Sequence, residues 1–261
     1  MRLNLVALAL AGTSSLALAG LLSAATPFEP LAVPQHHSTH IFDYQTGAIV
    51  SQSLPAQENA LIVYNNIEST PNAGLAFASA ATNRAYGDDL QMIQGGELSE
   101  FYFTIYNAAT AGNITTGTLE IDMYDTASFL GVGASTPVGS FDINIDYSAD
   151  PLPPGFFSTD GVIGLETLDI MLPTDVTVVQ KLTGITGGSN RDGVVSMSPV
   201  LVGSSPNDFY GAFDPYATNE GYYNLQSGAP AQVGYAIVVP EPTTLAVLAS
   251  AGLIALRRRR A

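Results

Sequence analysis

The sequence predicts an all-β fold: an antiparallel two-sheet sandwich, jelly-roll-like or immunoglobulin-like, flanked by an N-terminal signal helix and a short C-terminal transmembrane helix. Three observations predict it. Apolar and polar residues alternate in short runs along the middle of the chain, Gly, Pro, Asn and Asp fill the gaps, and no amphipathic helical pattern occurs between the two ends. About ten to twelve short strands at this spacing are typical of such sandwiches.

Length and composition fit one β domain between two processing signals. The chain has 261 residues, of which 46% are hydrophobic and only 12% charged, so it has enough apolar material for a core. It has no cysteine, and the core must therefore stabilise the fold without disulfides. We expect a signal peptide at 1–25, a flexible N-terminal segment at 26–39, a β-sandwich domain at 40–238 and a sorting tail at 239–261.

The strongest strand signals are four runs with one apolar and one polar face. Such runs predict half-buried antiparallel strands. The four runs are 101–106, 119–124, 141–147 and 168–172. Weaker candidates are 41–50, 60–65, 73–80, 176–182, 194–202, 209–213 and 232–238. Strand order cannot be derived from these patterns.

Charge is distributed unevenly between the middle and the ends. Between residues 26 and 239 the basic residues are Arg84, Lys181 and Arg191, against 22 acidic residues, which gives a net charge of about −19. A surface this acidic repels phosphate backbones, so we expect no nucleic-acid partner.

The N-terminus has the pattern of a secretion signal. Arg2 provides a short positive region, residues 3–22 are rich in Leu and Ala, and Ser23-Ala24-Ala25 forms a small-residue cleavage site. This pattern predicts export through the Sec machinery and removal of residues 1–25.

The C-terminus combines three pieces in a fixed order. Pro240-Glu241-Pro242 favours extended backbone, residues 243–256 carry no charge, and Arg257, Arg258, Arg259 and Arg260 follow. Fourteen helical residues span roughly 21 Å, less than a ~30 Å hydrocarbon core. The arginines stay on the cytoplasmic side by the positive-inside rule, which leaves the domain outside.

This arrangement resembles the PEP-CTERM sorting signal. The resemblance covers the last 23 residues and implies processing by an exosortase, a membrane-embedded cysteine protease or transpeptidase, with Pro240, Glu241 and Pro242 as the sorting motif and Arg257 to Arg260 as the membrane-stop flank. The same tail is also labelled an ice-binding protein C-terminal region, from which we infer no ice binding. The family is linked to bacteria that make exopolysaccharide.

Catalytic constellations are not evident in the sequence. The histidines are His36, His37 and His40, a cluster that could bind zinc or copper but is more simply interpreted as part of a solvated segment. No other histidine can serve a serine nucleophile, and the Gly-x-Ser-x-Gly, His-Glu-x-x-His and phosphate-loop motifs do not occur. We therefore predict no catalytic residues and no enzymatic activity.

Acidic residues leave two alternatives open. Glu120 with Asp122, and Asp142 with Asp146, share strand faces and could serve a glycoside hydrolase if two carboxylates were held about 5 Å apart. A calcium ion in a loop could use Asp88, Asp89 or Asp125, although solvated acidic loops explain these residues more simply.

Twelve tyrosines suggest a further alternative, a carbohydrate-binding module. Tyr102, Tyr106 and Tyr124 occupy the polar phase of their predicted strands, and a second group comprises Tyr210, Tyr216, Tyr222 and Tyr223. Exposed tyrosines can stack on sugar rings. The leading expectation remains a non-enzymatic structural or adhesive protein. It would be membrane-anchored before processing and would then reside at the cell surface, in the outer envelope or in the extracellular matrix.

Overall fold

The computed structural model describes residues 28–51, 60–77, 83–188, 191–206, 209–214, 216, 219–223 and 231–241. The predicted signal peptide, the apolar tail segment, Pro242 and Arg257 to Arg260 lie outside the described residues. The described part consists of strands and two short 3-10 helices, so the predicted all-β, mainly antiparallel fold is confirmed. No helix among these residues is long and apolar enough to cross a membrane.

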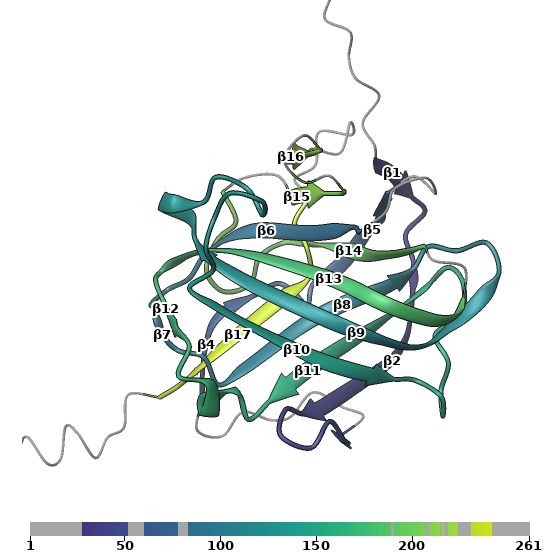
Figure 1. Ribbon diagram of the computed structural model, residues 1–261, viewed down its shortest axis with the longest axis horizontal. Coiled ribbons are helices and arrows are strands. Elements are labelled where there is room, and N and C mark those ends of the chain that lie inside the picture. Colours follow the sequence, from purple (N-terminus) through teal and green to yellow (C-terminus); the bar gives the residue numbers. More distant parts are fainter. Residues whose placement is uncertain are drawn as a thin grey trace, which may run out of the picture.

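The strands form two large sheets and one two-stranded ladder (Figure 1). The nine-stranded sheet contains β1 (Phe28–Leu31), β2 (Gln35–Asp43), β3 (Ile49–Ser51), β4 (Ala60–Asn65), β5 (Thr70–Phe77), β8 (Glu100–Asn107), β11 (Phe156–Ile163), β14 (Asp192–Ser198) and β17 (Tyr235–Pro240). The six-stranded sheet contains β6 (Ala85–Gln91), β9 (Gly112–Asp125), β10 (Gly139–Asp146), β13 (Asp175–Gly188), β15 (Phe209–Ala212) and β16 (Glu220–Tyr223). The ladder pairs β7 (Gly96–Glu97) with β12 (Met171–Leu172), and the 3-10 helices are η1 (Thr126–Ser128) and η2 (Leu165–Leu168).

Strand β8 is central to the nine-stranded sheet. The order is β1-β5-β14-β8-β11-β2-β3, and β17 joins β8 to β4. Both β14 and β17 pair along one edge of β8, while β11 occupies the other. All pairs are antiparallel except β2 with β11, which are parallel. In the six-stranded sheet the order is β10-β9-β13-β6-β15-β16.

One main hydrophobic core contains side chains from both large sheets. Ring pairs link the two layers: Phe101 of β8 contacts Phe141 of β10 at a centroid distance of 6.0 Å, and Phe77 of β5 contacts Tyr86 of β6 at 5.2 Å. The alternating runs of β9 and β10 direct Leu119, Ile121 and Phe141 into this core, as alternating strands on a half-buried sheet do.

Several strand predictions differ from the structure. The run 41–50 is a hairpin, because Gly47 takes a φ of +67° in the turn between β2 and β3. The run 168–172 begins with the last residue of η2 and continues through two residues without regular structure, where Asp169 adopts a φ of +51°, and only its last two residues form β12. Five strands lie outside the predicted runs: β1, β6, β7, β11 and β16.

The sheets extend past both expected domain limits. Residues 26–39 were expected to be flexible, yet they contain β1 and the first half of β2, which pair with β5 and β11. At the other end β17 continues to Pro240, and Val239 is a core residue only 1% exposed. Figure 1 shows β1 and the end of β17 at opposite sides of the molecule.

Candidate functional site

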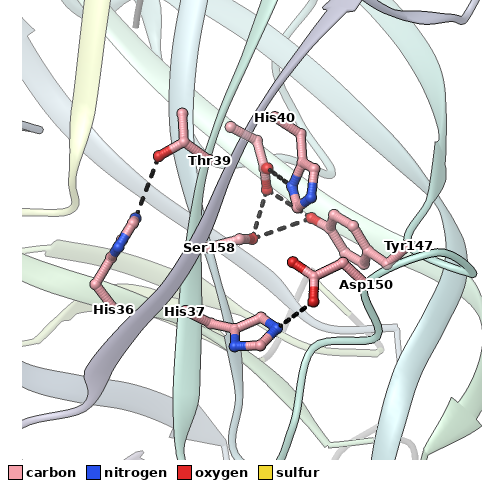
Figure 2. A network of polar contacts seen from close by, with 8 residues as sticks. His36, His37, Thr39, His40, Tyr147, Asp150 and Ser158 are labelled. Carbon is pink, nitrogen blue, oxygen red and sulfur yellow. Dashed lines mark hydrogen bonds and ion pairs between the residues drawn. The ribbon is translucent and has the colours of Figure 1, made fainter. Parts of the chain in front are cut away.

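A buried polar network connects the two sheets near the N-terminus (Figure 2). Asp160 on β11 is its centre. Its Oδ1 lies 3.0 Å from Nδ1 of His40 on β2, and its Oδ2 accepts hydrogen bonds from Tyr147 Oη and Ser158 Oγ, both at 2.5 Å. Tyr147 directly follows β10, so its hydroxyl bond joins the six-stranded to the nine-stranded sheet. All four residues are buried.

This network contains Ser, His and Asp, but it is not a catalytic triad. In a triad the serine hydroxyl bonds to the histidine. Here both Ser158 and His40 donate to the same carboxylate, and Tyr147 donates as well. Burial raises the pKa of Tyr147 well above its usual range, and the nearby Asp160 adds to that effect. The arrangement can fix strand register and sheet-to-sheet distance, since a satisfied buried carboxylate is costly to disturb.

The predicted histidine cluster is divided among separate partners. Figure 2 shows His36 bonded to Thr39 and His37 bonded to Asp150. His36 also packs edge-on against Phe157, and burial lowers its pKa despite the opposing effect of Asp160. The solvated-segment interpretation was wrong for His40, which is buried on the paired strand β2, whereas His36 is exposed and His37 half-buried. The described residues contain no group of three or more His, Asp or Glu that could hold a metal ion.

Asp88 lies on strand β6, not in the loop that the calcium alternative assumed. It is fully buried on the core side, where its carboxylate accepts hydrogen bonds from Ser205 Oγ at 2.8 Å and from the backbone N–H of Val233 at 2.9 Å. Burial raises its pKa well above the usual range. Protein donors thus occupy both carboxylate oxygens.

The other two residues of the calcium alternative are also bonded within the protein. Asp89, buried on the opposite face of β6, accepts hydrogen bonds from Thr177 Oγ1 at 2.5 Å and Tyr222 Oη at 2.7 Å. Asp125 caps η1 by accepting from the N–H of Ala127 at 3.0 Å. The three carboxylates therefore do not converge on one loop.

Tyr102, Tyr106 and Tyr124 are buried, although they occupy the polar phase of their strands. The rings of two of them cover glycines of neighbouring strands. A Cβ on Gly161 would lie 2.4 Å from the ring of Tyr102, and one on Gly74 would lie 2.5 Å from the ring of Tyr106. These tyrosines are packing residues and cannot stack on a sugar.

The outer face of the six-stranded sheet carries a partly exposed polar constellation, centred on Lys181 of β13. This residue is the only lysine in the chain. Its Nζ lies 2.8 Å from Asp122 and 3.8 Å from Glu120, both on β9, and 5.9 Å from the ring centre of Tyr216. Burial alone would lower the pKa of Lys181, but the hydrogen bond and charge of Asp122 outweigh it and raise the pKa.

Tyrosines border this constellation on the β15–β16 side. Tyr222 is 44% exposed and packs edge-on against the buried Tyr210, whose hydroxyl donates to Glu220. Tyr223 points to the opposite side, where it packs against Phe209 of the core. Of the four tyrosines in this group, Tyr216 and Tyr222 thus share the outer face with Lys181.

The paired carboxylates of the hydrolase alternative occupy the same open face. Asp142 and Asp146 are exposed on the edge strand β10. Lys181 forms ion pairs with both Glu120 and Asp122 on this open sheet face, whereas a glycosidase places one carboxyl in surroundings that raise its pKa for general-acid catalysis.

The described part of the sorting motif lies at the edge of the fold. Pro240 is the last residue of β17, where it pairs with Ala60, and both Pro240 and Glu241 are exposed. Val239 and Pro240 are extended, as predicted for this segment.

Sequence patterns missed Asp160, Ser158 and Lys181. The first two lie in a strand that shows no clear alternation, and the histidine partner of Asp160 is 120 residues away in sequence. Lys181 could have been recognised from the sequence, since a single lysine in so acidic a chain is conspicuous. Comparisons with protein-family models, curated proteins and solved structures found no match to this chain.

Proposed function

We propose that the chain is an exported, non-enzymatic protein of the cell surface or extracellular matrix, sorted through its C-terminal tail. One observation carries the proposal: the core strand β17 ends at Pro240, the first residue of the sorting motif. Val239 is buried in the core, while Pro240 and Glu241 are exposed. A protease at the membrane could therefore reach the motif while the domain remains folded.

The proposal joins this geometry to the two ends of the sequence. The Sec machinery would export the chain and residues 1–25 would be removed. Residues 243–256 and Arg257 to Arg260 would then hold it in the membrane until an exosortase-type protease processes it. For the domain itself we infer a two-sheet sandwich, jelly-roll-like or immunoglobulin-like, because side chains of both large sheets share one core. Such a domain suits a structural or adhesive role.

Two changes to the tail test the sorting proposal. Glu241→Ala removes the motif carboxylate, and deletion of 257–260 removes the positive flank. We expect both variants to remain unprocessed or to change location, as followed by cell fractionation and mass spectrometry. Glu166→Ala, an exposed acidic residue on η2, is the matched control and should behave as wild type. Normal processing of both tail variants would refute the proposal.

A carbohydrate-binding role is the second candidate, and the outer face around Lys181 favours it. Tyr216 and Tyr222 offer ring surface, while Asp122 and Glu120 offer acceptors for sugar hydroxyls. In a fragment of residues 26–241, Tyr222→Ala should weaken retention on a neutral polysaccharide matrix roughly 2–10-fold, the value of one aromatic contact. Ile93→Ala, an exposed residue near the β7–β12 ladder, should have no effect. No retention of the unaltered fragment on any sugar matrix would refute this candidate.

A carboxylate-based glycoside hydrolase is the third and least favoured candidate. It would have to use Glu120 and Asp122, which share one lysine on an open sheet face. Release of reducing sugar by the fragment, abolished by Glu120→Gln, would revive it.

A further inference from the structure

Three exposed apolar side chains lie at the end of the molecule where β17 ends. Ile93, Val138 and Met171, here called the exit patch, are 58%, 42% and 63% exposed. Exposed hydrophobic residues that cluster at one site mark interaction surfaces more often than scattered ones do.

The β7–β12 ladder connects the exit patch to the last strand. Met171 pairs with Glu97 across this ladder, and the neighbouring Gly96 lies against Val239, where a Cβ would be 3.3 Å from the Val239 side chain. Strand β7 therefore lies between Met171 on β12 and Val239 on β17, the residue that precedes Pro240.

The other two members of the patch border the same ladder. Val138 precedes Gly139, which touches the side chain of Ile170, the residue before Met171. Ile93 follows Met92, whose N–H donates to the carbonyl of Thr174 just after β12. One of the three apolar residues thus lies on the β7–β12 ladder, and the other two directly adjoin residues that contact the segment around β12.

The tail allows little separation between this end and a membrane. From Pro240, the last sheet residue, to Thr243, the first residue of the apolar segment, an extended chain covers about 10 Å. The headgroup layer on each side of the hydrocarbon core is itself about 5–8 Å thick. If residues 243–256 enter the bilayer, the end of β17 must lie within about 10 Å of the hydrocarbon core, in the headgroup layer or just outside it.

We propose that the exit patch contacts the headgroup layer of a phospholipid bilayer while the tail is inserted. The proposal rests on one step of the proposed function, the insertion of residues 243–256 into the membrane before processing. It adds to that step a surface of the folded domain. Glu97, Glu100 and Glu241 lie at the same end and would be repelled by anionic headgroups, so the fitting surface is zwitterionic. The domain would then be held in one orientation, with β7 and β12 toward the membrane.

The chain has no cysteine, so single-cysteine reporters can be introduced without background labelling. Met171→Cys reports on the exit patch and Ala251→Cys on the apolar segment. Asn113→Cys is the matched control, because Asn113 is exposed at the start of β9, far from the exit patch. The other end of β9 pairs with β10 next to Val138, and it lies about 30 Å from Asn113 along the strand. Each full-length variant carries an environment-sensitive fluorophore and is reconstituted in phosphatidylcholine vesicles with and without brominated lipid.

We expect a blue shift and loss of fluorescence at positions 171 and 251 and no change at 113. Replacing part of the phosphatidylcholine with phosphatidylglycerol should reduce the effect at 171 only. Quenching at 251 but not at 171 would overturn the docking surface and leave the membrane step of the proposed function standing. No quenching at 251 would overturn both, and equal quenching at 171 and 113 would overturn the defined orientation.

Discussion

Replacing Tyr147 with Phe tests whether the buried network around Asp160 stabilises the fold. The substitution keeps the ring and removes one hydroxyl, which donates to Asp160 at 2.5 Å in a fully buried site. A hydrogen bond to a charged group contributes about 1.5–3 kcal/mol. His40 and Ser158 still satisfy the carboxylate, so no further penalty for an orphaned charge is expected, and the free energy of unfolding should fall by that amount.

Urea unfolding of the 26–241 fragment, followed by circular dichroism, measures this loss. With a denaturant slope of about 2 kcal/mol per molar, the midpoint should move down by about 1 M. Tyr44→Phe is the control, since its ring packs on Phe141 and its hydroxyl makes no hydrogen bond to the described residues. It should change stability by less than about 0.5 kcal/mol. Equal midpoints for the two variants would show that the network contributes nothing measurable.

Three further substitutions test separate features. Burial raises the pKa of the Asp88 carboxyl in the folded state, so the native protein holds this proton more tightly than the unfolded chain does. That stabilisation is lost as the pH rises through the folded-state pKa, so Asp88→Asn should gain thermal stability relative to wild type as the pH is raised above about 4. Gly161→Ala should cost about 1–3 kcal/mol because its Cβ would meet the ring of Tyr102, whereas Gly221→Ala, which faces open space, should be near neutral in the same urea titration. Lys181→Met should lower the melting temperature more in dilute buffer than in about 1 M salt, where the Debye length of about 3 Å screens its carboxylate partners; an equal loss in both would contradict an ionic role.

The alternation of apolar and polar residues predicted strands that have one face on the core and the other toward solvent. In β9 and β10 the apolar phase enters the core, and the polar phase, apart from the buried Tyr124, is partly or fully exposed; both strands were predicted. The same reasoning located β8 but misjudged its second face, which is also covered. Phe101 and Phe103 face the core, while Tyr102 lies over Gly161 of a strand that comes much later in the chain. Whether the polar phase of a strand is buried depends on neighbouring strands that are distant in sequence, and a local pattern gives no information about them.

Strand β6 shows why the sequence placed the buried Asp88 and Asp89 in a loop. Gly87-Asp88-Asp89 has the composition of a turn, and carboxylates are seldom buried without partners. The partners exist, but Ser205 and Val233 follow more than a hundred residues later. Long-range hydrogen bonds therefore override local propensity at this strand, as they do at Asp160 on β11.

The position of β17 links folding to sorting. Its residues Tyr235, Ile237 and Val239 belong to the main core, and it pairs with both β4 and β8 in the nine-stranded sheet. The sheet is thus incomplete until the last strand before the tail has been exported, when the apolar segment that follows would already be at the membrane. Backbone inside a paired strand resists proteolysis because cleavage requires local opening. Under the proposed function the protease would therefore act on a folded domain, and the new C-terminus should lie at Pro240 or beyond. Mass spectrometry of the mature protein tests this directly, because a C-terminus before Val239 would mean that processing precedes or disrupts the pairing of β17.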